Sequence, residues 1–174
     1  MKQGAEIEAK YRLTPEQRTV IAGRLGEPAR VLRQRDVYFD VPDRVLRLRE
    51  ENGHTFVTRK DASTVTPDGI KSRHEVETPL PADAVPVLED LLCWLGHRRL
   101  IEVRKERHEF DLPGFVLCLD RIEGLSPGDF AEIESAGGSL DELRSLRDRL
   151  GLGESQAETR SYARMVAEAS GPAG

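Results

Sequence analysis

Charged and apolar residues alternate near the start of the chain, in the stretch Glu6-Ile7-Glu8-Ala9-Lys10. Successive side chains of an extended strand point to opposite faces, so the two glutamates and the lysine would share one face. The same alternation returns in three later stretches, at residues 46–49, 73–78 and 130–134. The pattern predicts strands that each have one apolar face and one charged face.

The chain contains about eight strand candidates, and turn signals separate most of them. Asn52-Gly53 is typical of a tight β-hairpin, and Pro113-Gly114 marks another turn. Strands joined by hairpins, with few helices between them, favour an antiparallel sheet that is closed or nearly closed. The predicted strands are residues 6–10, 31–41, 46–49, 55–60, 73–78, 100–112, 115–120 and 129–135.

Helices are predicted where apolar residues follow helical spacing between these strands. Thr14 with Gln17, and Ser139 with Glu142, have the spacing of a capping box at a helix N-terminus. We therefore expect helices after Thr14, over residues 84–95, after Ser139 and over residues 158–169. Trp94 is expected in the core, and Tyr162 is expected to pack within the last helix. Residues 61–71 show little periodicity and are predicted to form a loop.

Composition places limits on the class of protein. The 174 residues suit one domain over residues 1–170, with a loose tail at 171–174. The formal net charge is −5, so we expect no general attraction to nucleic acid polymers or to anionic membranes. No apolar run approaches the length of a membrane span, and no signal peptide opens the sequence. Cys93 and Cys118 are expected to be reduced and buried, as in a cytoplasmic protein.

The charged strand faces fit two arrangements, and the pattern alone leaves both open. In a sandwich, the apolar faces would meet in the core and the charges would face water. In a barrel covered by helices, the apolar faces would lie under the helices and the charges would line the interior. Such an interior must be wet, paired or filled by charged ligands, because burying unpaired charge is costly. The residues concerned are the acids Glu6, Glu8, Glu75, Glu77, Asp120, Glu132 and Glu134, and the bases Lys10, Arg47, Arg49, Lys60, Arg73, Lys105 and Arg107.

A charged interior of this kind suits one class of ligand in particular. Lysine and arginine side chains bind polyanions, and carboxylates bind hard divalent cations. A triphosphate together with Mg²⁺ or Mn²⁺ would satisfy both sets of side chains. A small closed barrel leaves room for its own side chains and one small ligand.

Several short motifs occur in order along the chain. The first is Glu6-x-Glu8-x-Lys10, and the others are Asp36-Val37-Tyr38-Phe39-Asp40, Arg47-x-Arg49, Thr58-x-Lys60, Arg73-x-Glu75-x-Glu77, Lys105-x-Arg107, Asp120, residues 128–134 and Ser161-Tyr162. Together they resemble the CYTH superfamily, whose members are also called triphosphate tunnel metalloenzymes, from residue 4 to about residue 167. The resemblance implies an α+β, mainly β fold: an eight-stranded antiparallel closed tunnel barrel with a charged interior and helices packed on the outside.

The resemblance also implies roles for the charged residues. The triphosphate would lie against Arg47, Arg49, Lys60, Arg73, Lys105 and Arg107, with Lys10 close by. Mg²⁺ or Mn²⁺ would be held by Glu6, Glu8, Glu132 and Glu134, with Asp120, Glu75 and Glu77 as further candidates. The catalytic candidates are Glu6 or Glu8, which would hold or deprotonate the attacking water, and Lys10.

Three functions remain open from the sequence. The first, which we favour because it asks for less specificity, is metal-dependent hydrolysis of tripolyphosphate, thiamine triphosphate or a nucleoside triphosphate. The second is the reaction of class IV adenylyl cyclases, which convert ATP to cyclic AMP and pyrophosphate. The third is a non-catalytic module that binds polyphosphate or nucleotide, although such a module has less need of so many carboxylates. We expect a small-molecule triphosphate as the partner, a monomer or homodimer, and a loop at residues 61–71 that closes one mouth of the tunnel.

Overall fold

The computed structural model describes residues 2–171, so the predicted tail beyond Gly171 lies outside the described residues. Strands predominate in the fold, as the alternating pattern predicts. Nine strands occur within the described residues: β1 (Lys2–Arg12), β2 (Arg30–Phe39), β3 (Val45–Glu51), β4 (His54–Lys60), β5 (Thr64–Val65), β6 (Lys71–Leu80), β7 (Arg99–Leu112), β8 (Phe115–Ile122) and β9 (Asp129–Ser135).

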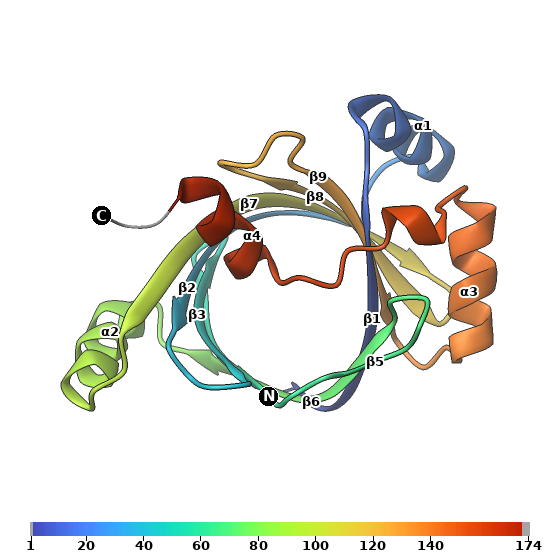
Figure 1. The fold of residues 1–174 in the computed structure, drawn as a ribbon. Coiled ribbons are helices and arrows are strands. Elements are labelled where there is room, and N and C mark those ends of the chain that lie inside the picture. Colours follow the sequence, from blue (N-terminus) through green and yellow to red (C-terminus); the bar gives the residue numbers. More distant parts are fainter. Residues whose placement is uncertain (1, 172–174) are drawn as a thin grey trace.

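All of these strands except β5 form a closed antiparallel barrel (Figure 1). The order around the barrel is β1-β9-β8-β7-β2-β3-β4-β6, and β6 pairs with β1 to complete the circle. In this closing pair Glu6 lies opposite Arg73. The two-residue β5 pairs with β6 and belongs to the segment predicted as a loop. The predicted tunnel barrel is therefore confirmed, and the sandwich arrangement is not.

Two tight turns set the register of the hairpins. Asn52 and Gly53, between β3 and β4, have φ angles of 46° and 83°, the left-handed conformation that a two-residue hairpin needs. Gly114, between β7 and β8, has a φ of 76°. A Cβ atom at Gly114 would lie 3.2 Å from the Cα atom of Gly138, so the close approach of these two segments requires glycine.

The α-helices are α1 (Pro15–Leu25), α2 (Ala84–Trp94), α3 (Leu140–Arg149) and α4 (Tyr162–Ser170), and a 3₁₀ helix covers Glu154–Gln156. Both predicted capping boxes form, at the start of α1 and of α3. The last helix begins later than residue 158 because Ser161 is its N-cap and accepts a hydrogen bond from the backbone amide of Arg164. No helix in the described part of the chain is long and apolar enough to cross a membrane.

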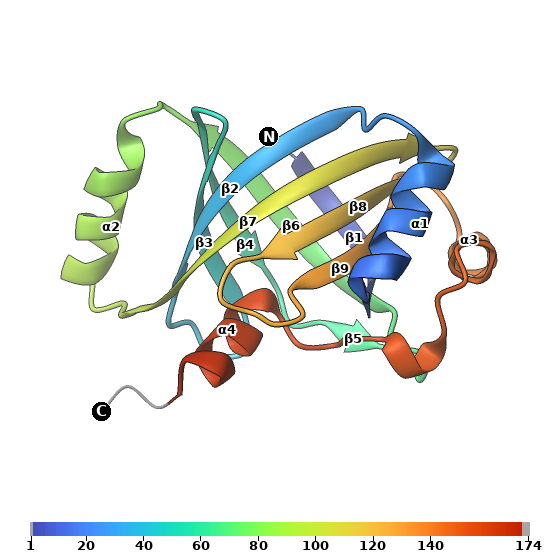
Figure 2. The same cartoon turned by 90° about the horizontal axis from the view of Figure 1, so that it is seen from above.

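Three helices cover the outer surface of the barrel (Figure 2). Near α1 and α3, the outward side chains of Tyr11, Leu117 and Ile133 are fully buried. On the opposite side, Val85 of α2 packs over Leu48 of β3. The apolar strand faces therefore lie under helices, and the charged faces point into the barrel.

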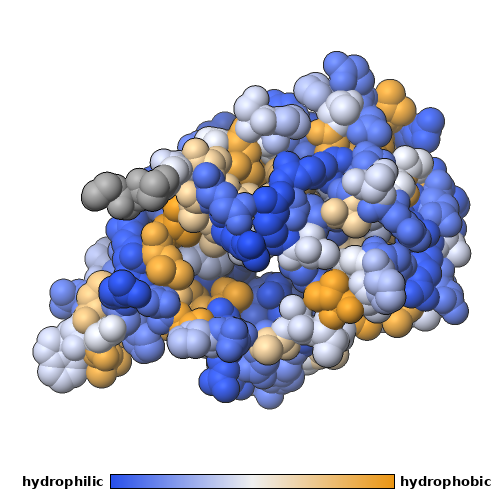
Figure 3. All heavy atoms as spheres, in the orientation of Figure 1, coloured by the Kyte–Doolittle hydropathy of each residue, from blue (hydrophilic) through white to orange (hydrophobic). Residues whose placement is uncertain are grey.

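The fourth helix, α4, lies at one mouth of the barrel and not on its side (Figures 1 and 2). Tyr162 and Met165 pack against Val103 and Phe130, and the two aromatic rings meet edge to face with centroids 5.2 Å apart. Val103 shares its strand face with Lys105, so this apolar cluster belongs to the end of the barrel interior. Figure 3 shows an opening beside this segment that is surrounded by polar side chains. The helix therefore narrows this mouth.

Two expectations about α2 are wrong. Trp94, expected in the core, is 81% exposed, and Cys93, expected to be buried, is also exposed. The helix turns one stripe, which includes Val85 and Leu92, toward the barrel, and Trp94 lies at its C-terminus away from that stripe. Cys118 is buried and both cysteines are free, as expected.

Candidate active site

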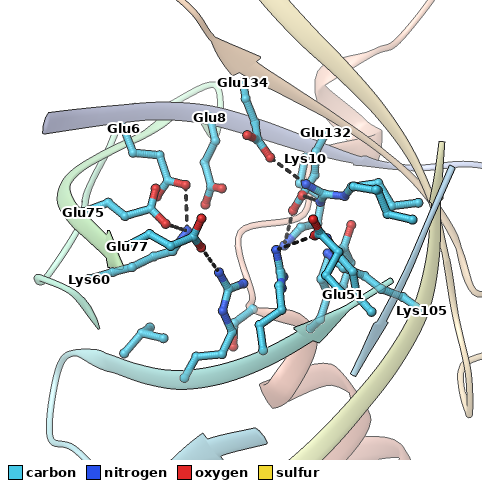
Figure 4. Close-up of a pocket in the computed structure, with 18 of the residues that line it drawn as sticks. Glu6, Glu8, Lys10, Glu51, Lys60, Glu75, Glu77, Lys105, Glu132 and Glu134 are labelled. Atoms are coloured by element: carbon cyan, nitrogen blue, oxygen red, sulfur yellow. Dashed lines mark hydrogen bonds and ion pairs between the residues drawn. The ribbon is translucent and has the colours of Figure 1, made fainter. Parts of the chain in front are cut away.

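Inward-facing charged side chains line a tunnel of about 270 Å³ through the barrel (Figure 4). The alternation along each strand explains this lining, because every second side chain points inward. Asp120, which is fully buried, is the one predicted site residue outside the lining. The predicted residues that line the tunnel are Glu6, Glu8, Lys10, Arg47, Arg49, Lys60, Arg73, Glu75, Glu77, Lys105, Arg107, Glu132 and Glu134.

Two arginines of β3 are held by an aspartate of β2. Arg49 donates two hydrogen bonds to Asp36, with Nε–Oδ1 and Nη2–Oδ2 distances of 2.6 and 2.7 Å. Arg47 Nη1 lies 3.6 Å from Asp36 Oδ2. Burial opposes the ionised form of Asp36, but these two guanidinium groups outweigh it and lower the pKa of the carboxyl. Asp36 therefore fixes both arginines in the tunnel wall.

The glutamates of β1 contact cations from β4 and β6. Lys60 Nζ donates to Glu6 Oε1 at 2.7 Å, and Arg73 Nε donates to Glu6 Oε2 at 2.8 Å. Arg73 also reaches Glu8, with an Nη2–Oε1 distance of 3.0 Å. Burial acts to lower the pKa of Lys60, but Glu6 and Glu8 outweigh it and the pKa is raised. These side chains form one connected ion-pair network, part of which Figure 4 shows around Glu6 and Lys60.

Arg107 of β7 joins three carboxylates. It donates two hydrogen bonds to Asp120, at 2.8 and 2.7 Å, and one to Glu134 at 2.9 Å, and it also donates to Glu132. Burial opposes the charge of Arg107, yet Asp120 first, followed by Cys118 and Glu132, raises the pKa of the guanidinium well above its ordinary value. Both oxygens of Asp120 are engaged in this way, so its position suits orienting Arg107 better than binding a metal.

Tyr162 connects α4 with the tunnel. Its hydroxyl donates a hydrogen bond of 2.8 Å to Asp120, and its ring lies 4.1 Å from Lys10 Nζ and 4.8 Å from Lys105 Nζ. Lys10 Nζ also lies 3.3 Å from a carboxylate oxygen of Glu132. The tyrosine was expected only to pack within the helix, but it also lines the tunnel and positions two of its lysines.

Lys71 is a tunnel residue that the sequence analysis missed. It is buried, lines the tunnel and lies opposite Glu8 in the pairing of β1 with β6. Burial, and after it the charge of Lys10, lower the pKa of Lys71. The signal was present, because Lys71 continues the alternation of Arg73 two residues toward the N-terminus. Asp36 begins the motif at residues 36–40, but the sequence did not predict its contacts with the tunnel arginines.

The carboxylates of β1 and β9 have the chemistry of a divalent-cation site. Glu8 pairs in register with Glu134, and Glu132 follows on the same face of β9. Within residues 2–171, no three acidic, histidine or cysteine side chains are grouped so that they could hold a metal ion. The glutamates of β9 instead contact Arg107. Burial raises the pKa of Glu134, and although Arg107 opposes this rise, the neighbouring Glu132 adds to it. A row of inward-facing carboxylates that repel one another fits a hard divalent cation.

Comparisons with known proteins agree with this geometry. The CYTH domain model matches residues 4–162. The adenylate cyclase CyaB of Aeromonas hydrophila is 30% identical over 176 residues, which cover 90% of this chain and 86% of that protein. The solved structure of the PH1012 protein from Pyrococcus horikoshii OT3 is 28% identical, has a TM-score of 0.80, and the match covers 93% of this chain and 99% of that one. The putative adenylyl cyclase HpAC1 from Hippeastrum, 16% identical, shares the fold with a TM-score of 0.70 over 95% of each chain. The chain therefore belongs to the CYTH domain family.

Proposed function

We propose that this protein is a divalent-metal-dependent enzyme that hydrolyses a triphosphate substrate in the tunnel. One observation carries the proposal: buried cations from β3, β4, β6 and β7 converge on a space of about 270 Å³, beside a carboxylate row from β1 and β9. A polyanion and a hard cation would each meet side chains of the opposite charge there.

The phosphate oxygens would replace glutamates on the tunnel cations. Arg73 and Arg107 contact carboxylates of β1 and β9, and a triphosphate can offer them charge-assisted hydrogen bonds of the same kind. Asp36 and Asp120 are 1% and 0% exposed, so they would keep their bonds to Arg49 and Arg107. These two aspartates would hold the guanidinium groups in place, so that little reorganisation is needed when substrate binds.

The carboxylates displaced in this way would become metal ligands. Glu6, Glu8, Glu132 and Glu134 would hold Mg²⁺ or Mn²⁺, with Glu75 and Glu77 as neighbours on β6, the strand that flanks β1 on the side away from β9. When bound, the metal would neutralise phosphate oxygens and favour cleavage of a phosphorus–oxygen bond. Substrate and metal binding would therefore support each other, because each frees the side chains that the other uses.

In the hydrolytic reaction, water attacks a phosphorus atom and the bond to a bridging oxygen breaks. Glu6 or Glu8 would orient the water and accept its proton, and Lys10 lies on the same inward face of β1. Lys105 and Arg107 would neutralise the charge that develops on the leaving phosphate. Positioning and charge neutralisation supply most of the catalysis in phosphoryl transfer, so no covalent intermediate is required.

Cyclisation of ATP is a second candidate reaction, and it is favoured by the 30% identity with a protein named adenylate cyclase CyaB. In that case the ribose 3′-hydroxyl would attack the α-phosphorus and pyrophosphate would leave. The same cations would neutralise the phosphates in both reactions. The outcome would depend on which phosphorus atom lies next to the nucleophile, and so on how the substrate lies along the tunnel.

The experiment that tests the proposal is a product analysis. The pure protein is incubated with Mg²⁺ or Mn²⁺ and, separately, with tripolyphosphate, thiamine triphosphate and ATP. Release of orthophosphate supports hydrolysis, and cyclic AMP with pyrophosphate supports cyclisation. Absence of any product from all three substrates, together with tight polyphosphate binding, would overturn the proposal in favour of a binding module.

A further inference from the structure

Gln34 of β2 presents a buried hydrogen-bond acceptor that has no donor. The side chain lines the tunnel and the residue is 4% exposed. Its Nε2 atom donates a hydrogen bond to Glu51 Oε2, whereas no donor among the described residues reaches its buried Oε1 atom. Buried polar atoms in proteins nearly always have a partner, so an exception inside a binding site points to a ligand.

The orientation of this amide is determined by its neighbour. If the Gln34 amide were reversed, its carbonyl oxygen would face the Glu51 carboxylate, and two acceptors would repel each other. Glu51 itself lies 4.0 Å from Arg49, which is already engaged by Asp36. Gln34 Oε1 and the Glu51 carboxylate therefore form a pair of acceptors, here called the acceptor pair, on one stretch of the tunnel wall.

This stretch borders the cationic part of the tunnel, since Lys105 lies opposite Gln34 in the pairing of β2 with β7, and it extends away from that part along β2. Leu32 contributes an apolar surface one step along the inward face of β2, and Arg30 is neutralised by Glu109 at an Nε–Oε2 distance of 2.7 Å. Figure 4 shows Glu51 on the side of the tunnel away from Glu6 and Glu75. Leu32 and Arg30 lie toward the N-terminal end of β2, whereas α4 packs near Tyr38 at the C-terminal end of that strand. Phosphate oxygens are acceptors, so the acceptor pair is unsuited to them.

We propose that the acceptor pair binds the organic group of the substrate, through N–H or O–H donors of that group. The substrate is then an organic triphosphate with hydrogen-bond donors, such as an aminated heterocycle or a sugar, and not inorganic tripolyphosphate. This inference rests on the proposed function, because it takes the triphosphate to lie on the tunnel cations. A buried acceptor that only the correct ligand can satisfy discriminates strongly against analogues that lack the donor.

The decisive variant is Gln34→Met, which keeps the length of the side chain and removes the acceptor. The measured quantity is the ratio of kcat/KM for ATP or thiamine triphosphate to kcat/KM for tripolyphosphate, with Mg²⁺. We expect wild type to prefer at least one organic triphosphate, and we expect Gln34→Met to lower that ratio by about tenfold or more. Gln3→Met, an exposed position on β1, is the matched control and should leave the ratio unchanged.

A binding measurement separates this inference from the proposed function. Calorimetric titration without added metal compares a non-hydrolysable ATP analogue and tripolyphosphate in wild type, Gln34→Met and Glu51→Gln. A fall in relative affinity for the ATP analogue in both variants supports the acceptor pair, even if no substrate is turned over and the proposed function fails. Because no metal is present, equal losses of affinity for all ligands would show a structural role and overturn the inference. A wild-type preference for tripolyphosphate, or unchanged ratios in both variants, would also overturn it.

Discussion

The hydroxyl of Tyr162 donates a hydrogen bond to Asp120, with 2.8 Å between the two oxygen atoms, and so connects the C-terminal helix to the interior of the barrel. The same aromatic ring lies over the ammonium groups of Lys10 and Lys105. The helix α4 therefore helps to set the positions of tunnel cations, in addition to narrowing one mouth.

Tyr162→Phe and Tyr162→Leu should separate the two contributions of this residue. The phenylalanine variant loses only the hydrogen bond to Asp120, so the free energy of unfolding should fall by about 1–2 kcal/mol. The leucine variant also loses the ring beneath the two lysines, and its kcat/KM for triphosphate should fall several-fold further. Denaturant unfolding and initial rates check both expectations. Equal rates in the two variants would show that the ring does not position the lysines.

Much of the barrel follows from the sequence alone, because the period of two in strand side chains is a strong local signal. Where acids and bases alternate with apolar residues, as around Glu8, Arg49 and Glu134, the charged and the apolar face of each strand could be assigned residue by residue. The choice between an inward and an outward charged face could not be made from the pattern alone. It depends on where the helices pack, which is a property of the whole fold.

Unlike Lys71, two residues whose roles sequence reasoning missed have weak local signals. Gln34 carries no charge, and its unsatisfied acceptor exists only because Glu51 of another strand fixes the amide. Tyr162 resembles an ordinary apolar residue of an amphipathic helix until Asp120 is placed beside it. Trp94 is hydrophobic and was expected in the core. It is exposed because only the side chains of α2 that face the barrel are buried, and Trp94 is not one of them.

Arg107→Lys should impair the enzyme although it conserves the charge. The guanidinium of Arg107 contacts Asp120, Glu132 and Glu134 at the same time, and the single nitrogen of an ammonium group cannot make all of these contacts. We expect kcat/KM to fall about tenfold or more and the free energy of unfolding to fall by about 1–3 kcal/mol. Arg33→Lys, on the exposed face of β2, is the control and should change neither quantity. A variant with wild-type rates would remove Arg107 from the phosphate-binding set.

Glu134→Gln and Lys105→Ala test the two halves of the proposed site separately. The first removes a proposed metal ligand and the second removes a cation that is proposed to bind the triphosphate, and each should lower turnover about tenfold or more. For Glu134→Gln, raising the concentration of Mg²⁺ or Mn²⁺ should restore part of the rate, whereas Lys105→Ala should not respond. The exposed Glu27→Gln serves as the control. Unchanged rates in both tunnel variants would refute their assignment.

The pH dependence should report the buried Lys71. Burial, followed by the charge of Lys10, lowers the pKa of this amine, and burial followed by Arg107 lowers the pKa of Lys105. In the proposed site a triphosphate would bind the protonated amines, so its affinity would be complete at pH values below these pKa values and would be lost as the pH rises through them. The alkaline limb of kcat/KM should therefore begin below the range of an ordinary lysine, which titrates near pH 10.4.

Lys71→Arg provides the test of this assignment, because a guanidinium stays protonated throughout the accessible range. The alkaline limb should move to higher pH in Lys71→Arg. It should keep its position in Lys60→Arg, because the pKa of Lys60 is raised by Glu6 and Glu8 and does not define the limb. A limb that remains in place in Lys71→Arg would mean that Lys105 or another group causes it.

The segment at residues 61–71, which joins β4 to β6, is expected to close one mouth of the tunnel, and proteolysis can test this expectation. Asp68 in this segment pairs with Arg144 of α3, with an Oδ2–Nε distance of 2.9 Å, and also lies 3.4 Å from Arg147. These contacts anchor the segment to the outside of the barrel. Limited proteolysis by a nonspecific protease should therefore cleave wild type slowly, both with and without tripolyphosphate, whereas Asp68→Asn should be cleaved faster because the anchor is weakened. Protection of wild type only in the presence of tripolyphosphate would instead support a lid that closes over the occupied tunnel.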